Sequence, residues 1–206
     1  MFTTTYDFAT GNNTDGDGML MVGIYNSHDS TSSTPEEWLN WCSTSSGGYT
    51  HLFYTNDNDG SSNWQIIKNG DNANAGVITG TYPAFEWAEN YGSKYGLSGS
   101  YASDWYIPSI NELIALNDSI DLVNTVFDNV WIGDLTRDIY GIANTMNSSY
   151  FSSSQEKNST IDDYDKKACT FSFYTENIAC GYKDKGDVLL ESGGNPQYVL
   201  VVRKVN

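Results

Sequence analysis

The strongest local signal in this sequence is SDWYIPSINELIALND (Ser103–Asp118). Ser109 stands at an N-cap position and Glu112 follows three residues later, which is the spacing of a capping box. Apolar residues then recur at helical spacing (Ile110, Leu113, Ile114 and Leu116). We therefore expect a helix that begins after Ser109 and buries one side. A second helix is predicted for residues 81–97, where Ala84, Ala88, Tyr91 and Tyr95 share one helix face.

Short strand-like runs separated by polar loops make up most of the remaining chain. Before the helices they are Met19–Tyr25, Thr50–Tyr54 and Trp64–Ile67, and Lys68–Gly76 has the composition of a loop. After the helices they are Tyr150–Ser154, Ala168–Tyr174, Ile178–Tyr182, Val188–Glu191 and Tyr198–Val205. The last run is almost continuously apolar, which is typical of a central strand buried on both faces.

Two helices followed by many short strands predict an α+β fold, with the helices packed on a small antiparallel sheet and long polar loops between the strands. No internal repeat is visible in the sequence. We expect a single domain over residues 1–206, in which residues 1–80 form a loop-rich N-terminal part and residues 81–206 form the remainder.

The composition is acidic and polar. Acidic residues outnumber basic residues by 26 to 10, and the formal net charge is −16. Nucleic acids and anionic membranes are therefore unfavourable partners, because both are bound through clustered Lys and Arg. Ser, Asn and Thr account for 62 of the 206 residues, and Tyr for another 15. These residues favour turns, and Tyr-rich polar loops suit binding.

Export signals and a disulfide framework are both missing from the sequence. The opening stretch MFTTTYDFAT lacks the basic and apolar regions of a secretory signal, and no apolar run could span a bilayer. The chain is then either not exported as it stands or a domain of a longer surface protein.

The chain has three cysteines, Cys42, Cys169 and Cys180, and an odd number is not a disulfide framework. Cys169 and Cys180 flank a predicted hairpin and could face each other, but we expect both to be small buried side chains.

Four segments, DWYIPSINELIAL, YFSSSQE, ACTFSFYTENI and VLVVRKV, follow one another along roughly the last two-thirds of the chain. In this order they resemble the helix entry, the aromatic-aromatic-Ser-Ser strand, the following strand and the closing strand of the Lcl C-terminal domain family. That family is named from a bacterial collagen-like adhesin. Two positions depart from its pattern: Phe151 replaces the usual Trp, and Val201–Val202 lack the Cys that often precedes the closing Val-Arg pair.

The resemblance implies a C-type-lectin-like fold, with two main helices flanking a small twisted antiparallel sheet. It also implies binding rather than catalysis, to surfaces, glycans or glycosaminoglycans, and in some members to phage receptors. Related sulfatase-modifying enzymes share the fold and oxidise their substrate with a cysteine pair. Because a shared fold does not carry a shared function, we do not expect that activity here.

Aromatic and planar polar side chains gather in three late segments, as they do in ligand sites with an apolar floor and a few oriented polar atoms. The candidate ligand-binding residues are Trp131, Asp134, Arg137, Tyr140, Asn158, Asp162, Asp163, Tyr164, Tyr182 and Lys183. The alternative is that Trp131 is a core residue and that the charged side chains are solvated. The sequence favours neither interpretation.

Two loops carry a fragment of a calcium-binding pattern. Their candidate metal ligands are Asn13, Asp15, Asp17, Asp57 and Asp59. Both loops lack the acidic residue that should close an EF-hand, since Ile24 and Ile66 stand at that position. We favour Asx turns over calcium in both loops and expect no cofactor.

We therefore expect a non-enzymatic extracellular module that recognises a glycan or a receptor on a cell surface, without membrane insertion. The charge favours a neutral glycan or a protein receptor over a polyanion. A phage tail-tip receptor-binding protein of the same fold, including a variable protein of a diversity-generating system, is the alternative. A hydrolase comes third, because nothing marks a catalytic group among the many Ser and Asp residues near His28 and His51.

Overall fold

The computed structural model describes residues 3–6, 18–23, 39–44, 46, 48–72, 80–121, 149–184 and 197–205. Its helices are Asn63–Asn72 (α1), Pro83–Lys94 (α2) and Ile110–Asn117 (α3), with short 3-10 turns at Gly60–Ser62 (η1), Gly99–Ala102 (η2) and Tyr164–Lys166 (η3). Its strands are Thr3–Tyr6 (β1), Gly18–Val22 (β2), Ser149–Gln155 (β3), Lys167–Ser172 (β4), Asn177–Tyr182 (β5), Gln197–Val199 (β6) and Val202–Val205 (β7). This is the α+β class that the sequence predicts.

The strands form two sheets where the sequence led us to expect one antiparallel sheet. One sheet has the order β1-β2-β7 and is antiparallel. The other has the order β5-β4-β3-β6 and is mixed, because β6 runs parallel to β3. The prediction of a single antiparallel sheet is therefore wrong in its strand directions. The C-terminal segment supplies β6 to one sheet and β7 to the other without reversing its direction. In that single direction it runs parallel to β3 and antiparallel to β2.

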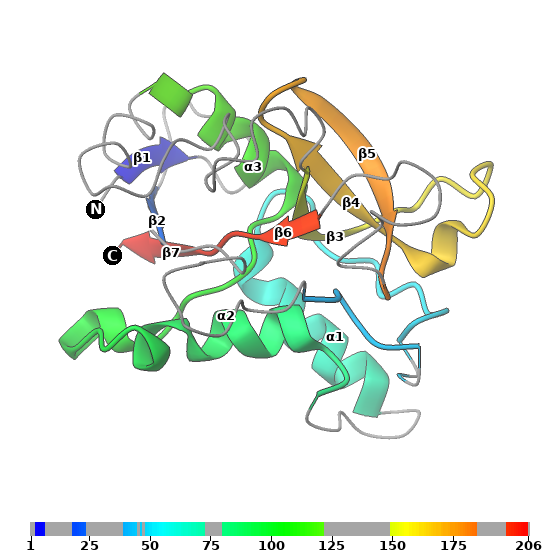
Figure 1. Ribbon diagram of the computed structural model, residues 1–206, viewed down its shortest axis with the longest axis horizontal. Coiled ribbons are helices and arrows are strands. Elements are labelled where there is room, and N and C mark those ends of the chain that lie inside the picture. Colours follow the sequence, from blue (N-terminus) through cyan, green and yellow to red (C-terminus); the bar gives the residue numbers. More distant parts are fainter. Residues whose placement is uncertain are drawn as a thin grey trace, which may run out of the picture.

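The C-terminal segment Tyr198–Val202 crosses the centre of the molecule from β6 to β7 (Figure 1). All five of its residues are buried, as the apolar run predicts. The predicted single central strand is nevertheless divided, since Leu200 and Val201 lie between two short strands of different sheets. Val202 also exchanges backbone hydrogen bonds of 2.9 Å with Tyr106, so the segment is paired on its other side as well.

Side chains of this segment alternate between two hydrophobic cores. Tyr198, Leu200 and Val202 enter the core packed by α3, which also contains Leu113. Val199 and Val201 enter the core packed by α1 and α2. Successive strand residues point to opposite faces, so a run without polar residues is buried only where both faces are covered. Figure 1 shows α3 on one side of the segment and α1 and α2 on the other.

Both predicted helices are present. Ser109 accepts a hydrogen bond from the Glu112 N–H while the Glu112 side chain accepts one from the Ser109 N–H, so the capping box is confirmed. The upstream helix begins at Pro83, with Tyr82 as its N-cap. Pro is well suited to the first helical position, because the N–H that it lacks would have no partner there.

The prediction of a strand at Trp64–Ile67 and a loop from Lys68 is wrong, because these residues belong to α1. The Trp64 ring stacks on Phe85 of α2 at 5.1 Å, and Ile67 is fully buried in the same core. Gly70, which suggested a loop, lies where an added Cβ would meet the Phe53 ring at 2.6 Å. Packing against α2 thus outweighs the weak helix propensity of this stretch.

Most of the predicted strands are present. Tyr150–Ser154 lies in β3, and the hairpin around residues 173–176 joins β4 to β5. Thr50–Tyr54 forms no strand, because the Phe53 N–H bonds to the Gln155 side chain at 2.6 Å instead of to a neighbouring strand. Val188–Glu191 lies outside the described residues. No helix among the described residues is long and apolar enough to cross a membrane.

Glu112 joins the turn at Gly60 to residues 106–109 through a carboxylate with no exposed surface. Its Oε2 accepts hydrogen bonds from the Gly60 N–H at 2.9 Å and the Ser109 N–H at 2.7 Å. Its Oε1 accepts a bond from the Tyr106 hydroxyl at 2.9 Å. Burial raises the pKa of Glu112 to about 7, although these three bonds favour the ionised form.

We expect Glu112→Gln to change how stability depends on pH. The folded-state pKa of about 7 exceeds the ordinary value of 4.5, so the folded state holds the proton more tightly than the unfolded state. This contribution is complete below pH 4.5 and is lost as the pH rises through about 7. Its size is on the order of 3 kcal/mol. Gln keeps an acceptor for the two N–H groups and removes the titration.

Urea unfolding at a series of pH values measures the effect. Relative to the wild type, the free energy of unfolding of Glu112→Gln should increase by on the order of 3 kcal/mol as the pH rises through about 7. Glu89→Gln, which changes an exposed carboxylate of α2, is the matched control and should follow the wild-type profile within about 1 kcal/mol. Parallel profiles for Glu112→Gln and the wild type would show that Glu112 does not titrate in this range.

Candidate functional site

The predicted ligand residues after β3 lie together with the end of β5. Asn158, Asp162 and Asp163 are exposed, and Tyr164 begins η3. The Tyr182 hydroxyl lies 3.4 Å from Asp163 Oδ2 and donates a hydrogen bond to it. We call Asn158, Asp162, Asp163, Tyr164 and Tyr182 the strand-end surface. The structure thus brings together residues that are up to 24 positions apart in the sequence.

Charges on the strand-end surface are largely paired with one another. Lys166 Nζ lies 2.7 Å from Asp163 Oδ1, and Lys167 Nζ lies 5.1 Å from the centre of the Tyr182 ring. The hydrogen bond from Lys166 lowers the pKa of Asp163, and the same bond raises the pKa of Lys166. Asp163 has a φ of 56°, so its backbone is in the left-handed region that Asp tolerates better than most residues. The turn is therefore held in one conformation by its own side chains.

Tyr54 is a candidate ligand residue that the sequence analysis missed. Its side chain is 75% exposed, the largest exposed fraction among the described large apolar side chains that face solvent. Its φ of 52° is unusual for a bulky residue. Backbone strain of this kind persists only where the surroundings enforce it, and it occurs often at functional sites. No sequence signal distinguishes Tyr54 from the other tyrosines, because the exposure and the φ angle both depend on tertiary contacts.

Hydrogen bonds on both sides of Tyr54 fix its position. The Phe53 N–H donates to Gln155 Oε1 at 2.6 Å, and the Gln155 N–H donates to Thr55 Oγ1 at 2.9 Å. Lys157 Nζ donates to the Thr55 carbonyl at 2.7 Å. Asn158 directly follows Lys157, so the backbone of residues 155–158 positions both Tyr54 and the start of the strand-end surface.

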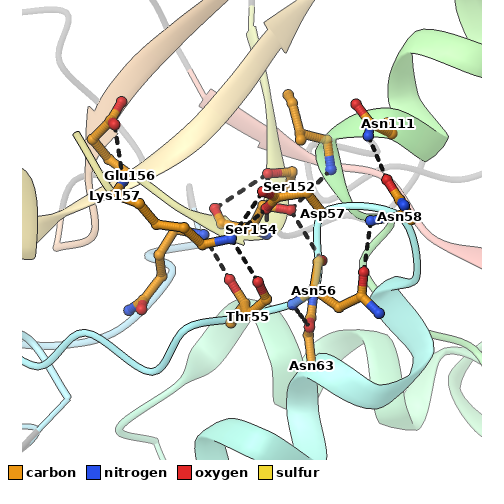
Figure 2. A network of polar contacts seen from close by, with 12 residues as sticks. Thr55, Asn56, Asp57, Asn58, Asn63, Asn111, Ser152, Ser154, Glu156 and Lys157 are labelled. Atoms are coloured by element: carbon orange, nitrogen blue, oxygen red, sulfur yellow. Dashed lines mark hydrogen bonds and ion pairs between the residues drawn. The ribbon is translucent and has the colours of Figure 1, made fainter. Parts of the chain in front are cut away.

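A buried polar network lies behind this part of the chain (Figure 2). Ser154 Oγ donates to the Asn56 carbonyl at 3.3 Å and accepts from the Ile110 N–H at 3.1 Å. Asn63 Nδ2 donates to the Asn56 carbonyl at 2.9 Å and to Ser153 Oγ at 2.7 Å. Ser152, Ser153 and Ser154 have no exposed surface. Small hydroxyl side chains in β3 thus satisfy loop groups that would otherwise be buried without partners.

Of the candidate calcium ligands, the structure describes Asp57 and Asp59, and the carboxylates of both contact other protein groups. Both carboxylate oxygens of Asp57 accept from Lys157 Nζ at 2.8 Å. Asp59 Oδ1 accepts from the Ser61 N–H at 3.0 Å, and its Oδ2 pairs with Lys204 at 2.8 Å. The bond from the Ser61 N–H to Asp59 is the Asx turn that the sequence favours over calcium, and each carboxylate faces a different lysine. Within the described ranges, no group of three His, Cys, Asp or Glu residues could hold a metal ion.

The other candidate calcium ligands, Asn13, Asp15 and Asp17, lie outside the described residues. The candidate ligand-binding residues Trp131, Asp134, Arg137 and Tyr140 lie outside them as well. The predictions for these seven residues stay predictions.

The prediction that Lys183 binds a ligand is wrong, because Lys183 has no exposed surface and cannot contact one. The three N–H donors of its ammonium group are shared among four backbone carbonyls: Gly48 at 3.0 Å, Tyr49 at 3.4 Å, His51 at 3.0 Å and Asp165 at 2.6 Å. It also lies 5.3 Å from the centre of the Trp41 ring. Burial lowers the pKa of Lys183 to about 8. The residue is therefore a structural cation that ties residues 48–51 and η3 to the end of β5.

Comparisons with protein-family models, with curated proteins and with solved structures gave no match to this chain.

We expect Lys183→Met to destabilise the protein by at least about 3 kcal/mol, because it leaves buried carbonyls without a donor and removes a cation. The matched control is Lys166→Met, which removes an ammonium group from a surface ion pair and should cost no more than about 1 kcal/mol. Chemical unfolding followed by circular dichroism measures both. Equal stability of Lys183→Met and the wild type would refute the structural role of this ammonium group.

Proposed function

We propose that this protein is a non-enzymatic binding module that recognises a glycan or a receptor on a cell surface. The proposed contact region is the strand-end surface together with Tyr54. The observation that carries the proposal is the exposed Tyr54 residue at a positive φ, whose neighbours Phe53 and Thr55 are held by hydrogen bonds to Gln155 and Lys157. A residue whose backbone conformation is costly and whose ring faces solvent is well suited to contact a partner.

The chemistry of the surface suits a sugar or a polar protein surface. The rings of Tyr54, Tyr164 and Tyr182 can supply flat apolar contact area with a polar tip. The Asn158 amide and the exposed carboxylates of Asp162 and Asp163 can supply oriented polar atoms. Ligand sites combine these two kinds of group. The polar network behind β3 keeps the groups ordered before binding, so less conformational entropy is lost on association.

The charge of the protein narrows the class of ligand. The whole chain carries a formal charge of −16. Near this surface Lys157 pairs with Asp57, Lys166 pairs with Asp163, Lys183 is buried among carbonyls, and Lys167 lies over the Tyr182 ring. A polyanion such as a sulfated glycosaminoglycan would meet repulsion here. We infer that the ligand is a neutral glycan or a protein receptor, and that the protein acts outside the cell.

The arrangement of the elements supports the finer proposal of a C-type-lectin-like fold. An early strand, β2, pairs with the last strand, β7, and the helices lie between them along the chain. The hairpin of β4 and β5 carries one end of the strand-end surface. Function in such a fold is expected on loops that a rigid sheet supports, which is the position of residues 156–166.

A glycan array probed with the purified protein, with and without EDTA, tests the function. We expect binding to a neutral glycan that is insensitive to EDTA and leaves the glycan intact. Tyr54→Ala and Tyr182→Ala should each weaken binding about tenfold, which corresponds to about 1.4 kcal/mol. Tyr174→Ala is the matched control, because Tyr174 is 57% exposed and lies in the turn at the far end of the same hairpin.

Each outcome decides a different part of the proposal. Equal loss in all three variants, or in none of them, would remove the strand-end surface as the contact region. Release of sugar fragments would overturn the non-enzymatic assignment. If the protein binds no glycan on the array, the wild type and the same three variants are screened against cell-surface proteins. Absence of binding in that screen as well would overturn the binding function.

A further inference from the structure

Cys169 of β4 and Cys180 of β5 are direct partners in an antiparallel pair. Residues that face each other in this way have their side chains on the same face of the sheet. The structure records both thiols as free, and both side chains are partly exposed. The third cysteine, Cys42, is fully buried in the core packed by α1 and α2. Cys169 and Cys180 are thus both partly exposed, with Cys169 packed against the edge of the α3 core, whereas Cys42 has no exposed surface.

The register places this pair at the position that a disulfide requires. The Lys183 N–H donates to the Lys166 carbonyl at 2.9 Å, one step beyond the Lys167–Tyr182 pair, so Lys166 and Lys183 form a hydrogen-bonded pair. Hydrogen-bonded and non-hydrogen-bonded pairs alternate, which makes Cys169–Cys180 a non-hydrogen-bonded pair. Such pairs have Cα atoms about 4.5 Å apart. Disulfides span Cα separations of about 4.4–6.8 Å, so the bond needs little movement of either strand.

The surroundings of Cys180 add a proton acceptor. Its thiol donates a hydrogen bond to Glu156 Oε2, and the other oxygen of Glu156 accepts from the N–H groups of Lys157 and Asn158. Burial opposes ionisation of Glu156, but these hydrogen bonds outweigh it and lower the pKa of the carboxyl group. The thiol pair thus adjoins the residue at which the chain leaves β3 for the strand-end surface.

We propose that Cys169 and Cys180 form a reversible modification site, at which a low-molecular-weight disulfide such as glutathione disulfide converts the two thiols into a cross-strand disulfide. The Cys180 thiolate attacks one sulfur of the oxidant and releases the first small thiolate. The Cys169 thiolate then attacks the Cys180 sulfur of this mixed disulfide and releases the second. The protein loses two electrons and two protons, and the oxidant takes up both to give two small thiols.

Two consequences follow for the protein. Cys180 and Tyr182 lie two residues apart in β5 and so share one face of the strand, which puts the modification beside the proposed ligand surface. Oxidation also removes the thiol donor of Glu156. Burial raises the pKa of each thiol to about 12, so the reaction is slow at neutral pH and accelerates as the pH rises.

The experiment uses the folded, fully reduced chain incubated with glutathione disulfide at several pH values. The reaction is stopped with acid, and the intact mass and the thiol content after unfolding are measured. We expect the wild type to lose two of its three thiols and two hydrogen atoms, without retaining glutathione, at a rate that increases about tenfold per pH unit. Peptide mapping of the oxidised wild type should locate the bond between Cys169 and Cys180.

Three variants complete the design. Cys42→Ser should form the same bond and leave no free thiol. Cys169→Ser and Cys180→Ser should yield no internal disulfide and stop at a glutathione adduct or at free thiols. A stable glutathione adduct on the wild type, a bond that includes Cys42, or oxidation only in denaturant would each overturn the proposal. The wild-type mapping decides the question even if a serine variant fails to fold.

Discussion

Burial of the segment Tyr198–Val202 on both of its faces is the constraint on which the rest of the structure depends. An extended segment without polar side chains must be covered above and below, and its backbone groups must find partners within the protein. Gly23 donates to the Val201 carbonyl at 2.9 Å, and Tyr106 pairs with Val202. Because successive side chains of the segment point to opposite faces, α3 packs against one face and α1 with α2 against the other.

Two buried ionisable side chains, Glu112 and Lys183, then hold the polar loops against this framework. Loops rich in Ser, Asn and Asp bury too little apolar surface to offset the entropy lost on ordering. Glu112 gathers N–H groups from Gly60 and Ser109, and Lys183 gathers carbonyls from residues 48–51 and from Asp165. The two residues are complementary, since one supplies acceptors to orphaned donors and the other supplies donors to orphaned acceptors. Removing either leaves several loop groups buried and unpaired.

The proposed ligand surface and the thiol pair both follow from the hairpin of β4 and β5. Its register determines that Cys169 faces Cys180, and it sets Tyr182 against the turn that contains Asp163. Glu156 links the two features, because it accepts a hydrogen bond from Cys180 at the point where the chain enters that turn. The sulfur atom of Cys180 is therefore separated from the start of the proposed ligand surface by one hydrogen bond and a few covalent bonds.

The sequence alone determined the features that depend on neighbouring residues. The capping box of Ser109 and Glu112, the helix after Pro83 and the β4–β5 hairpin all follow from local spacing, and so does the burial of the C-terminal run. Tertiary structure decided the features that depend on distant partners. Asn63–Asn72 is a helix because Trp64 and Ile67 pack against α2, and Lys183 is buried because four carbonyls from other segments surround it. The position of Tyr54 likewise depends on hydrogen bonds from Gln155 and Lys157 to its neighbour Thr55, about 100 positions away in the sequence. Local patterns specify how a segment folds, whereas the environment of a side chain depends on which other segments come to lie beside it.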